Sequence, residues 1–287
     1  MDIGIGLPNT VPGTAGGTLV DWARSAEEAG FSTLGTIGRI VYPNYEELVA
    51  LSAAAAVTSR IRLTTAVLLA PLYANTVLLA KQAASLDRLS GGRLVLGLGL
   101  GGRDDDFTAS GLSTRGRGRR LEQQIELMRR VWSGEKFGDA GGIGPEPARP
   151  GGPELILGGA TPASFARVAR LGDGWIMGGG TPEMFAQGAA AVAEAWRQAG
   201  RAGSPRTITL AYFALGPDAR AQADAYLHHY YAWLGDFAAR IAAAAATSAE
   251  MVRSYAAAFE SSGCDEVIFM PTASRPDQVT RLAEAIA

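Results

Sequence analysis

The stretch Leu79–Gly102, LAKQAASLDRLSGGRLVLGLGLGG, decides the fold. Residues 80–89 carry apolar side chains at helical spacing, and Ser90-Gly91-Gly92 supplies a turn, because glycine tolerates the positive φ that ends many helices. Residues 93–100 form a nearly continuous apolar run of strand length. A strand that is apolar on both faces is typical of a parallel sheet covered by helices. Polar residues begin after it, at the strand end where α/β folds bind ligands.

An alternation of strand and helix continues along the whole chain. The first half predicts strands at 3–7, 31–37, 61–69 and 93–100, with helices at 18–30, 45–58, 76–89 and 121–132. The second half predicts strands at 154–158, 174–178, 206–215 and 266–270. Its helices are expected at 162–171, 182–200 and 276–286, with two or three more in 219–246 and 249–262; residues 138–153 are expected to form a loop. This order predicts a (β/α)8 TIM barrel that forms a single domain over residues 1–287.

Composition excludes several classes of protein. With 47% hydrophobic and 19% charged residues, the chain can bury a large core, which excludes a disordered protein. A formal net charge of -2 gives no electrostatic basis for binding nucleic acid. The single cysteine, Cys264, excludes an intramolecular disulfide and is typical of a reducing cytoplasm. The start lacks a basic region, and Pro71 and Asn75 interrupt the longest uncharged run, so we expect a cytoplasmic protein without membrane contact.

Two glycine-rich turns precede helices at the predicted carboxyl ends of adjacent strands. They are Gly158-Gly159-Ala160-Thr161-Pro162 and Gly178-Gly179-Gly180-Thr181-Pro182. Each places Thr at the N-cap position and Pro at the first helical position. Free backbone N–H groups and the positive end of the helix dipole favour a bound phosphate. Either turn alone is an ordinary capped connection, but two on adjacent strands indicate a phosphate-bearing cofactor.

Three segments resemble signatures of the bacterial luciferase-like family of flavin-dependent oxidoreductases. They are the stretch 79–102, with its Leu-Asp-x-Leu-Ser-x-Gly-Arg turn, Ile156-Leu157-Gly158-Gly159, and Leu171-Gly172-Asp173-Gly174-Trp175-Ile176. The resemblance implies that the loops after strands five and six hold the phosphate of a flavin or deazaflavin, with the ring across the barrel mouth near strands three and four. The implied cofactor-binding residues are Ala70, Gly99, Leu100, Gly101, Gly158, Gly159, Ala160, Thr161, Gly178, Gly179, Gly180 and Thr181.

The catalytic acid or base is harder to assign. Family members often carry His, Asp or Glu just after strand two, whereas this chain offers only Arg39 and Tyr42 there. Of the paired histidines His228 and His229, one could face the pocket as an acid or base, although a packed or exposed helical histidine is the plainer reading. We take His229 and Arg39 as candidate catalytic residues. Asn9, Tyr42 and Tyr73 are taken to line the substrate pocket, and we expect no metal site.

The resemblance implies an oxidoreductase, and the sequence leaves its chemistry open. The favoured reading is a monooxygenase that uses reduced flavin mononucleotide (FMN) and oxygen on a small organic substrate. The alternatives are a hydride-transfer reductase or dehydrogenase that uses the deazaflavin coenzyme F420, and a non-catalytic flavin-binding barrel. We also expect a homodimer through the second and third helices, which are rich in Ala and Leu on more than one face, and a separate reductase that supplies reduced cofactor.

Overall fold

Eight parallel strands close into a barrel in sequence order, with β8 paired to β1. The structure is a computed structural model that describes residues 1–287, apart from the side chain of Ala140. The predicted (β/α)8 barrel is therefore confirmed. The strands are β1 (Asp2–Gly6), β2 (Thr33–Thr36), β3 (Arg62–Thr65), β4 (Leu94–Leu98), β5 (Glu154–Gly158), β6 (Gly174–Met177), β7 (Arg206–Phe213) and β8 (Glu266–Pro271).

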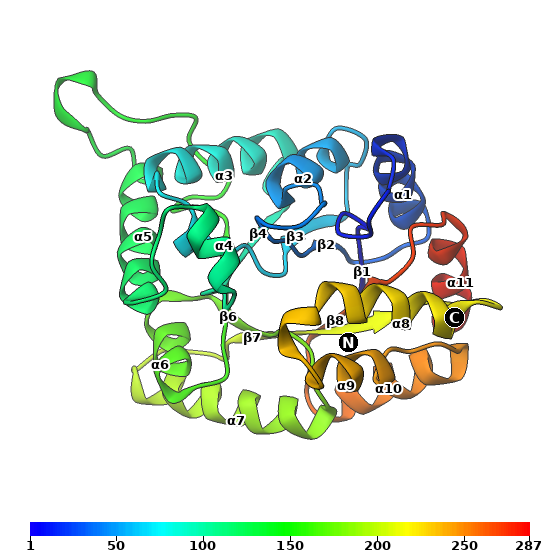
Figure 1. Cartoon of the computed structure of the whole chain (residues 1–287). Coiled ribbons are helices and arrows are strands. Elements are labelled where there is room, and N and C mark those ends of the chain that lie inside the picture. The colour runs from blue at the N-terminus through cyan, green and yellow to red at the C-terminus, as the bar shows by residue number, and fades with distance from the viewer.

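The helices surround the strands (Figure 1). They are α1 (Gly16–Glu28), α2 (Glu47–Ala55), α3 (Thr76–Ser90), α4 (Asp104–Ala109), α5 (Arg117–Trp132), α6 (Pro162–Leu171), α7 (Pro182–Gln198), α8 (Ala219–Tyr230), α9 (Phe237–Ala243), α10 (Ala249–Ser261) and α11 (Asp277–Ile286), with short 3₁₀ turns η1 (Ala70–Leu72), η2 (Gly138–Ala140) and η3 (Ala232–Leu234). The connection between α5 and β5 extends away from the barrel, as the loop prediction requires.

One helix of the structure is absent from the sequence prediction, and one predicted helical region is resolved in detail. The segment after β4 contains the short helix α4, which the sequence reading left out. Its first turn holds three aspartates, whose negative charge favours a helix N-terminus. Residues 219–246 break into α8, η3 and α9, and Gly235 between the last two has φ 55 and ψ -131, which is not helical. With α10, this gives the upper number of helices expected in that region.

The Leu-Asp-x-Leu-Ser-x-Gly-Arg turn joins α3 to β4, and its half-buried Arg93 and buried Asp87 fix the neighbouring loops. Gly91 ends α3 with φ 72, as expected for a left-handed cap. The Arg93 guanidinium donates to the carbonyl oxygens of Ala55, Thr58 and Ile61, and so fixes the end of α2 to the start of β3. Asp87 is fully buried, and its Oδ2 accepts from the backbone N–H groups of Ala148 and Arg149 in the α5–β5 loop. The motif therefore holds together the α2–β3, α3–β4 and α5–β5 connections, which lie at the amino ends of the strands.

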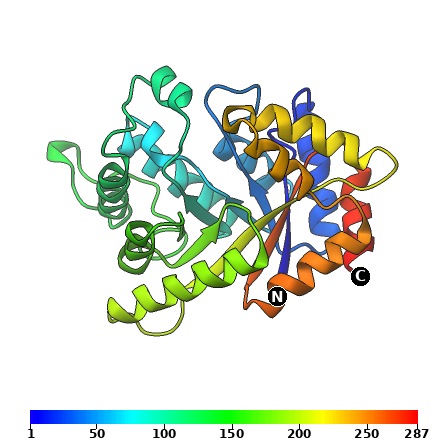
Figure 2. The ribbon, with the colours of Figure 1, turned by 60° about the horizontal axis from the view of Figure 1, so that its bottom comes forward.

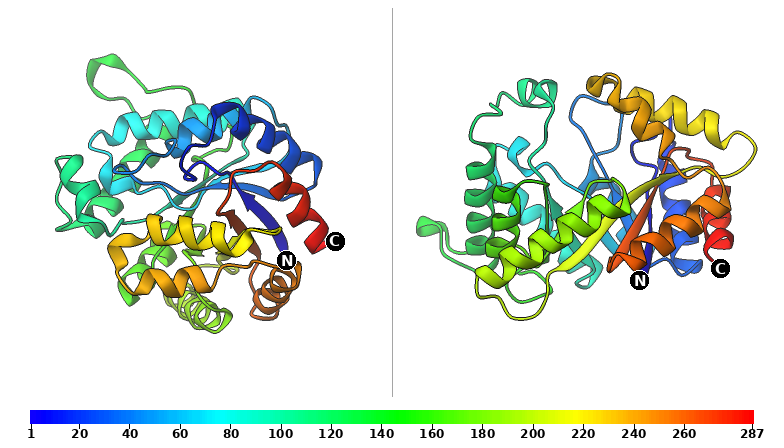
Figure 3. Two further views of the ribbon diagram at one scale, coloured as in Figure 1. Left: turned by 45° about the vertical axis from the view of Figure 1, so that its right-hand side comes forward. Right: turned by 90° about the horizontal axis from the view of Figure 1, so that it is seen from below.

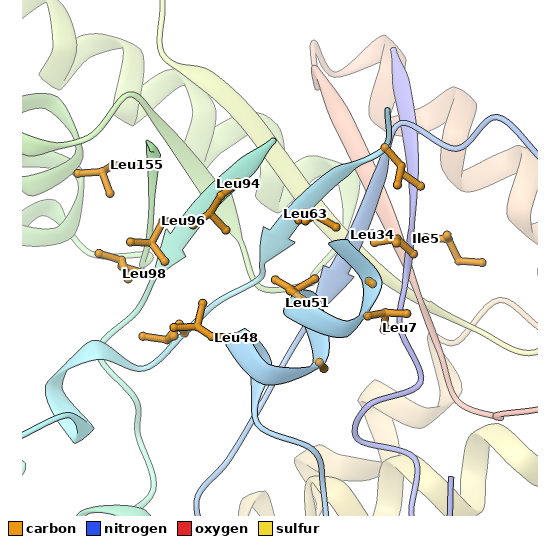
Figure 4. Packing of buried hydrophobic residues seen from close by; sticks show 14 of the residues in the cluster. Ile5, Leu7, Leu34, Leu48, Leu51, Leu63, Leu94, Leu96, Leu98 and Leu155 are labelled. Carbon is orange, nitrogen blue, oxygen red and sulfur yellow. The ribbon is translucent and has the colours of Figure 1, made fainter. Parts of the chain in front are cut away.

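The main core lies between the outer face of the barrel and the helices. Figure 4 shows Leu34, Leu63 and Leu94 of adjacent strands beside Leu48 and Leu51 of α2. All five are buried. Inward-facing residues alternate with these and form a second cluster inside the barrel, which includes Ile156, Ile176, Ile208 and Ile268.

Glycine replaces bulky side chains where β4 meets the end of β3. A Cβ on Gly97 would lie 1.9 Å from the Thr65 carbonyl oxygen, and one on Gly99 would lie 2.4 Å from a Val67 methyl group. Only glycine therefore lets these two strands approach as they do. The alternating Leu-Gly pattern of the deciding stretch follows directly: its leucines face the outer core and its glycines face inward.

Helices α4, α8 and α9 lie at the carboxyl end of the barrel, opposite the N-terminus (Figure 2 and the right panel of Figure 3). Helices α8 and α9 run side by side and cover the β7, β8, β1 and β2 part of this end. The β3 to β6 part is left for a cavity.

Candidate active site

A cavity of about 610 Å³ opens at the carboxyl ends of β3, β4, β5 and β6. This volume is typical of a cofactor or small-molecule site. None of the described lining residues carries a charged side chain. The lining comes from these strand ends and from α6 and α7: Ala66, Val67, Leu69, Gly99, Leu100, Gly101, Gly158, Gly159, Ala160, Phe165, Trp175, Ile176, Met177, Gly178, Gly179, Met184, Gln187 and Gly188.

Most of the predicted cofactor residues meet at this cavity, although they come from three separate loops. The lining includes Gly99, Leu100, Gly101, Gly158, Gly159, Ala160, Gly178 and Gly179. The remaining four, Ala70, Thr161, Gly180 and Thr181, lie outside the lining.

The two threonines cap the helices that begin at the cavity edge. Thr161 Oγ1 accepts from the N–H of Ser164, and Thr181 Oγ1 accepts from the N–H of Met184, each at 3.3 Å. Both helices have Pro at the first position, as the sequence predicted. The positive dipole ends of α6 and α7 therefore lie beside the cavity, where they favour a negative group.

Trp175 fixes the wall between these two helices. Its Nε1 donates to the Gly159 carbonyl oxygen at 2.8 Å, and its ring packs edge-on against Phe165. Asp173, two residues earlier, accepts from the N–H of Leu155 at 2.9 Å. The carboxylate thus holds the start of β6 to β5.

Ala70 lies away from the cavity because the chain turns into η1 there. It is fully buried, and its carbonyl oxygen accepts from the side-chain amide of Gln124 at 2.9 Å. The strand predicted over 61–69 is interrupted: β3 ends at Thr65, Ala66 and Val67 line the cavity, and Leu68 pairs again with Leu98. Ala66 and Val67, and not the predicted Ala70, therefore line the cavity at the end of β3.

The candidate catalytic residues Arg39 and His229 lie outside the cavity lining, above β2 and on α8. Arg39 Nη2 forms an ion pair with Asp105 at 2.9 Å. His229 is exposed, and its Nδ1 forms a 2.8 Å hydrogen bond with the Tyr42 hydroxyl. The two candidates share one neighbour, because the Arg39 guanidinium also lies 5.1 Å from the centre of the Tyr42 ring.

Asn9 and Tyr73 hold loops near the mouth. The Asn9 side-chain amide donates to the carbonyl oxygens of Ile37 and Tyr45, and the residue is 1% exposed. The Tyr73 hydroxyl donates to Glu46 at 2.7 Å, and burial raises its pKa. Neither side chain lines the cavity.

A group of tyrosines that sequence reasoning missed closes the other half of the mouth. Tyr212 of β7 shares a 2.6 Å hydrogen bond with the Tyr231 hydroxyl, and Tyr226 shares one of 2.6 Å with Thr10. Tyr230 stacks on Tyr226. Burial raises the pKa of each of these four tyrosines, so all are neutral at physiological pH. The spacing Tyr226, Tyr230, one turn of helix apart, was the signal available in the sequence.

Glu47 is a buried carboxyl group that the sequence reading also missed. It is 6% exposed, and its carboxyl atoms fill the space beside Gly38 where a Cβ would lie within 2.5 Å. Burial raises the pKa of Glu47 to about 8, and the neighbouring Glu46 and Asp106 add to the shift. Glu47 therefore occupies the end of β2 as a neutral acid at pH 7.

Glu47→Gln is expected to change how stability depends on pH. Because the folded-state pKa is raised, wild type loses stability as pH rises from about 4.5 toward 8, whereas Gln cannot ionise. The variant should gain about 3 kcal/mol relative to wild type between pH 4.5 and pH 7. Urea unfolding across this range measures the difference. Glu46→Gln is the control, and a constant difference between Glu47→Gln and wild type would contradict the expectation.

The described residues contain no group of three or more His, Cys, Asp or Glu side chains placed to hold a metal ion. None of their helices is both long enough and apolar enough to span a membrane.

The family is shown by comparison with known proteins. The model of the luciferase-like monooxygenase family matches residues 1–263, and the chain belongs to this family. Its members are oxidoreductases, including monooxygenases and F420-dependent dehydrogenases.

Two curated relatives match part of the chain. An uncharacterized protein of Mycobacterium tuberculosis is 36% identical over 171 residues, which cover 56% of this chain and 60% of the relative. An F420-dependent glucose-6-phosphate dehydrogenase of Amycolatopsis mediterranei is 28% identical over 175 residues, which cover 55% of this chain and 52% of the enzyme. The chain thus spans less than two thirds of the length of these relatives.

Solved structures share the fold over the whole chain. The monooxygenase RslO1 from Streptomyces bottropensis superposes with a TM-score of 0.77 at 24% identity, covering 100% of this chain and 96% of that one. An F420-dependent secondary alcohol dehydrogenase in complex with an F420-acetone adduct superposes with a TM-score of 0.80 at 16% identity, covering 100% and 99%. The same barrel therefore occurs in both chemical classes.

Proposed function

We propose that this chain is an oxidoreductase that binds a flavin-type cofactor in the cavity between β3 and β6. The observation that supports this most strongly is the convergence of two capped helix N-termini on an uncharged, glycine-lined cavity. The loops at Gly158–Ala160 and Gly178–Gly179 would hold the phosphate, with Thr161, Gly180 and Thr181 supporting them. The ring would lie against Val67 and the strand end at Gly99–Gly101.

The cavity suits such a group in shape as well as charge. A Cβ on Gly178 would meet nothing within 4 Å, so the glycine leaves open space inside the cavity. Phe165, Trp175 and Met177 supply apolar walls, which exclude water from a bound ring. The family membership supports the same group.

The favoured chemistry is monooxygenation with reduced FMN. When bound, reduced FMN supplies two electrons to oxygen, so that one oxygen atom enters the organic substrate and the other leaves as water. Tyr42 would contact the substrate at the mouth, and Asn9 and Tyr73 would hold the loops around it. The Tyr42–His229 hydrogen bond provides a path for a proton between the mouth and solvent, and Arg39 would hold Tyr42 in place.

Hydride transfer with coenzyme F420 is the second candidate. The match to an F420-dependent glucose-6-phosphate dehydrogenase over 175 residues favours it. In that case the cavity would hold a deazaflavin and no oxygen would be consumed.

Two protein partners belong to this proposal, a reductase and a second copy of the chain. A separate reductase would supply reduced FMN to this cytoplasmic enzyme. A homodimer would cover the apolar side chains that α2 and α3 expose, Val49 at 65%, Leu78 at 50% and Leu89 at 78%.

Parallel titrations with FMN and coenzyme F420, each oxidised and reduced and followed by fluorescence, test the proposal. We expect selective binding of reduced FMN with a Kd in the micromolar range, followed by oxygen uptake in the presence of substrate. Selective binding of F420 would replace monooxygenation by hydride transfer. Binding without turnover of any substrate would favour the non-catalytic barrel, and binding of neither cofactor would refute the proposal.

A further inference from the structure

Arg103 is a buried cation without a carboxylate partner. The residue is 8% exposed, and the structure gives its guanidinium one hydrogen bond, from Nη2 to the Tyr230 carbonyl oxygen at 3.3 Å. Its Nε has no partner. Although three aspartates follow directly in the sequence, none of the described carboxylates forms an ion pair with it. A buried charge in this state is costly unless another group neutralises it.

Arg39 brings a second guanidinium to the same point. Its Nη1 donates to the same Tyr230 carbonyl oxygen at 3.4 Å, and its Nε is likewise buried without a partner. Asp105, 47% exposed, is its one carboxylate. Two cations therefore converge on one neutral carbonyl oxygen, and among the described residues only Asp105 forms an ion pair with either of them.

Aromatic rings surround these two guanidinium groups. Arg103 lies 4.9 Å from the centre of the Tyr230 ring and 5.1 Å from that of Trp233. Arg39 lies over Tyr42 on the other side. Trp233 is 48% exposed and reaches across to Gly102, where a Cβ would meet its ring at 3.3 Å. The rings form flat apolar walls that can also hold a planar ligand.

This cluster borders the cofactor cavity on the side away from α6 and α7. Gly101, two residues before Arg103, lines the cavity. Ala66 and Val67, which also line it, pack in the same apolar cluster as Tyr230 and Tyr231. The arginines are therefore placed to meet a substrate that lies over the cofactor, at the opposite end from the proposed phosphate site.

We propose that Arg103 and Arg39 bind the carboxylate or phenolate of an aromatic substrate, whose ring packs against Tyr42 and Trp233. The inference rests on the proposed function, because it assigns the substrate side of the same mouth. A planar guanidinium fork recognises a carboxylate through two parallel hydrogen bonds, which the unpartnered N–H groups can supply. The Tyr230 carbonyl oxygen is the acceptor that such an anion would replace. The competing reading is that both arginines serve only to hold the C-terminal end of α8.

Isothermal titration calorimetry with 2-naphthoate and its neutral counterpart 2-naphthamide tests this inference. We expect wild type to prefer the carboxylate by about tenfold in Kd, and Arg103→Met to lose that preference. Arg103→Lys keeps the charge but not the fork, so it should fold as wild type and keep part of the preference. Arg119→Met removes an exposed arginine on α5 and should change nothing.

Several outcomes would overturn the inference. Equal binding of the two probes to wild type, or binding of neither, would contradict the proposed anion site. An unchanged preference in Arg103→Lys and Arg103→Met leaves the arginines with a structural role. Parallel titration of Arg103→Met with FMN and F420 should give the wild-type Kd, and a matching tenfold loss would instead assign the charge to the cofactor phosphate. Because the probes bind without turnover, failure of the proposed function gives a separate result.

Discussion

Replacing Gly178 by phenylalanine is expected to weaken cofactor binding by at least about a hundredfold while the protein stays folded. Gly178 follows β6 and lines the cavity, and a Cβ there would meet no atom within 4 Å. Its φ lies outside the left-handed region, so a side chain causes no backbone strain. The added ring must therefore project into the space that we assign to the cofactor.

Fluorescence titration of the Gly178→Phe protein with FMN and F420 measures the effect. Gly17→Phe is the matched control, because Gly17 also has open space around its Cβ but lies exposed on α1. Wild-type affinity in a folded Gly178→Phe protein would show that the cofactor binds elsewhere. Circular dichroism of both variants establishes that the fold is intact.

Gly97→Ala is expected to cost about 3 kcal/mol or more in the free energy of unfolding. The new Cβ would lie 1.9 Å from the backbone oxygen of Thr65, which no rotation of a side chain can relieve. The Thr65 hydroxyl also donates to the Gly97 carbonyl oxygen, so the two strands cannot separate without losing this bond. The substitution forces β3 and β4 apart at the point where the cavity begins.

Urea unfolding of Gly97→Ala, compared with Gly158→Ala, measures this cost. Gly158 also faces inward at a strand end, but a Cβ there would make ordinary contacts at 3.7 Å. The control should therefore stay within about 1 kcal/mol of wild type. If both variants are equally stable, the close approach of β3 and β4 is not the reason that glycine is needed at position 97.

The parts of the fold that depend on local pattern were predictable from the sequence. All eight strands follow from short apolar runs, and the caps at Thr161 and Thr181 follow from Thr-Pro at the start of each helix. The break in 219–246 was harder to place, because its many alanines carry a helical pattern through η3. Helix α4 was missed because six residues are too few for a clear period.

The candidate site likewise contains residues that the sequence predicts and residues that it does not. Most cavity residues could be predicted, because the glycines and the helix caps that form the cavity wall lie next to each other in the sequence. The arginine–tyrosine cluster joins residues far apart, since the residue numbers differ by 191 for Arg39 and Tyr230 and by 127 for Arg103 and Tyr230. The burial of Glu47 likewise depends on Gly38 across a loop. Neither contact leaves a local pattern in the sequence.

A crystal structure of the protein with its bound cofactor tests the central claim most directly. The account predicts a phosphate group within hydrogen-bond distance of backbone N–H groups in both loops, Gly158–Ala160 and Gly178–Gly179, with the ring beside Val67. A cofactor whose phosphate contacts neither loop, or one that lies outside the cavity, would contradict it.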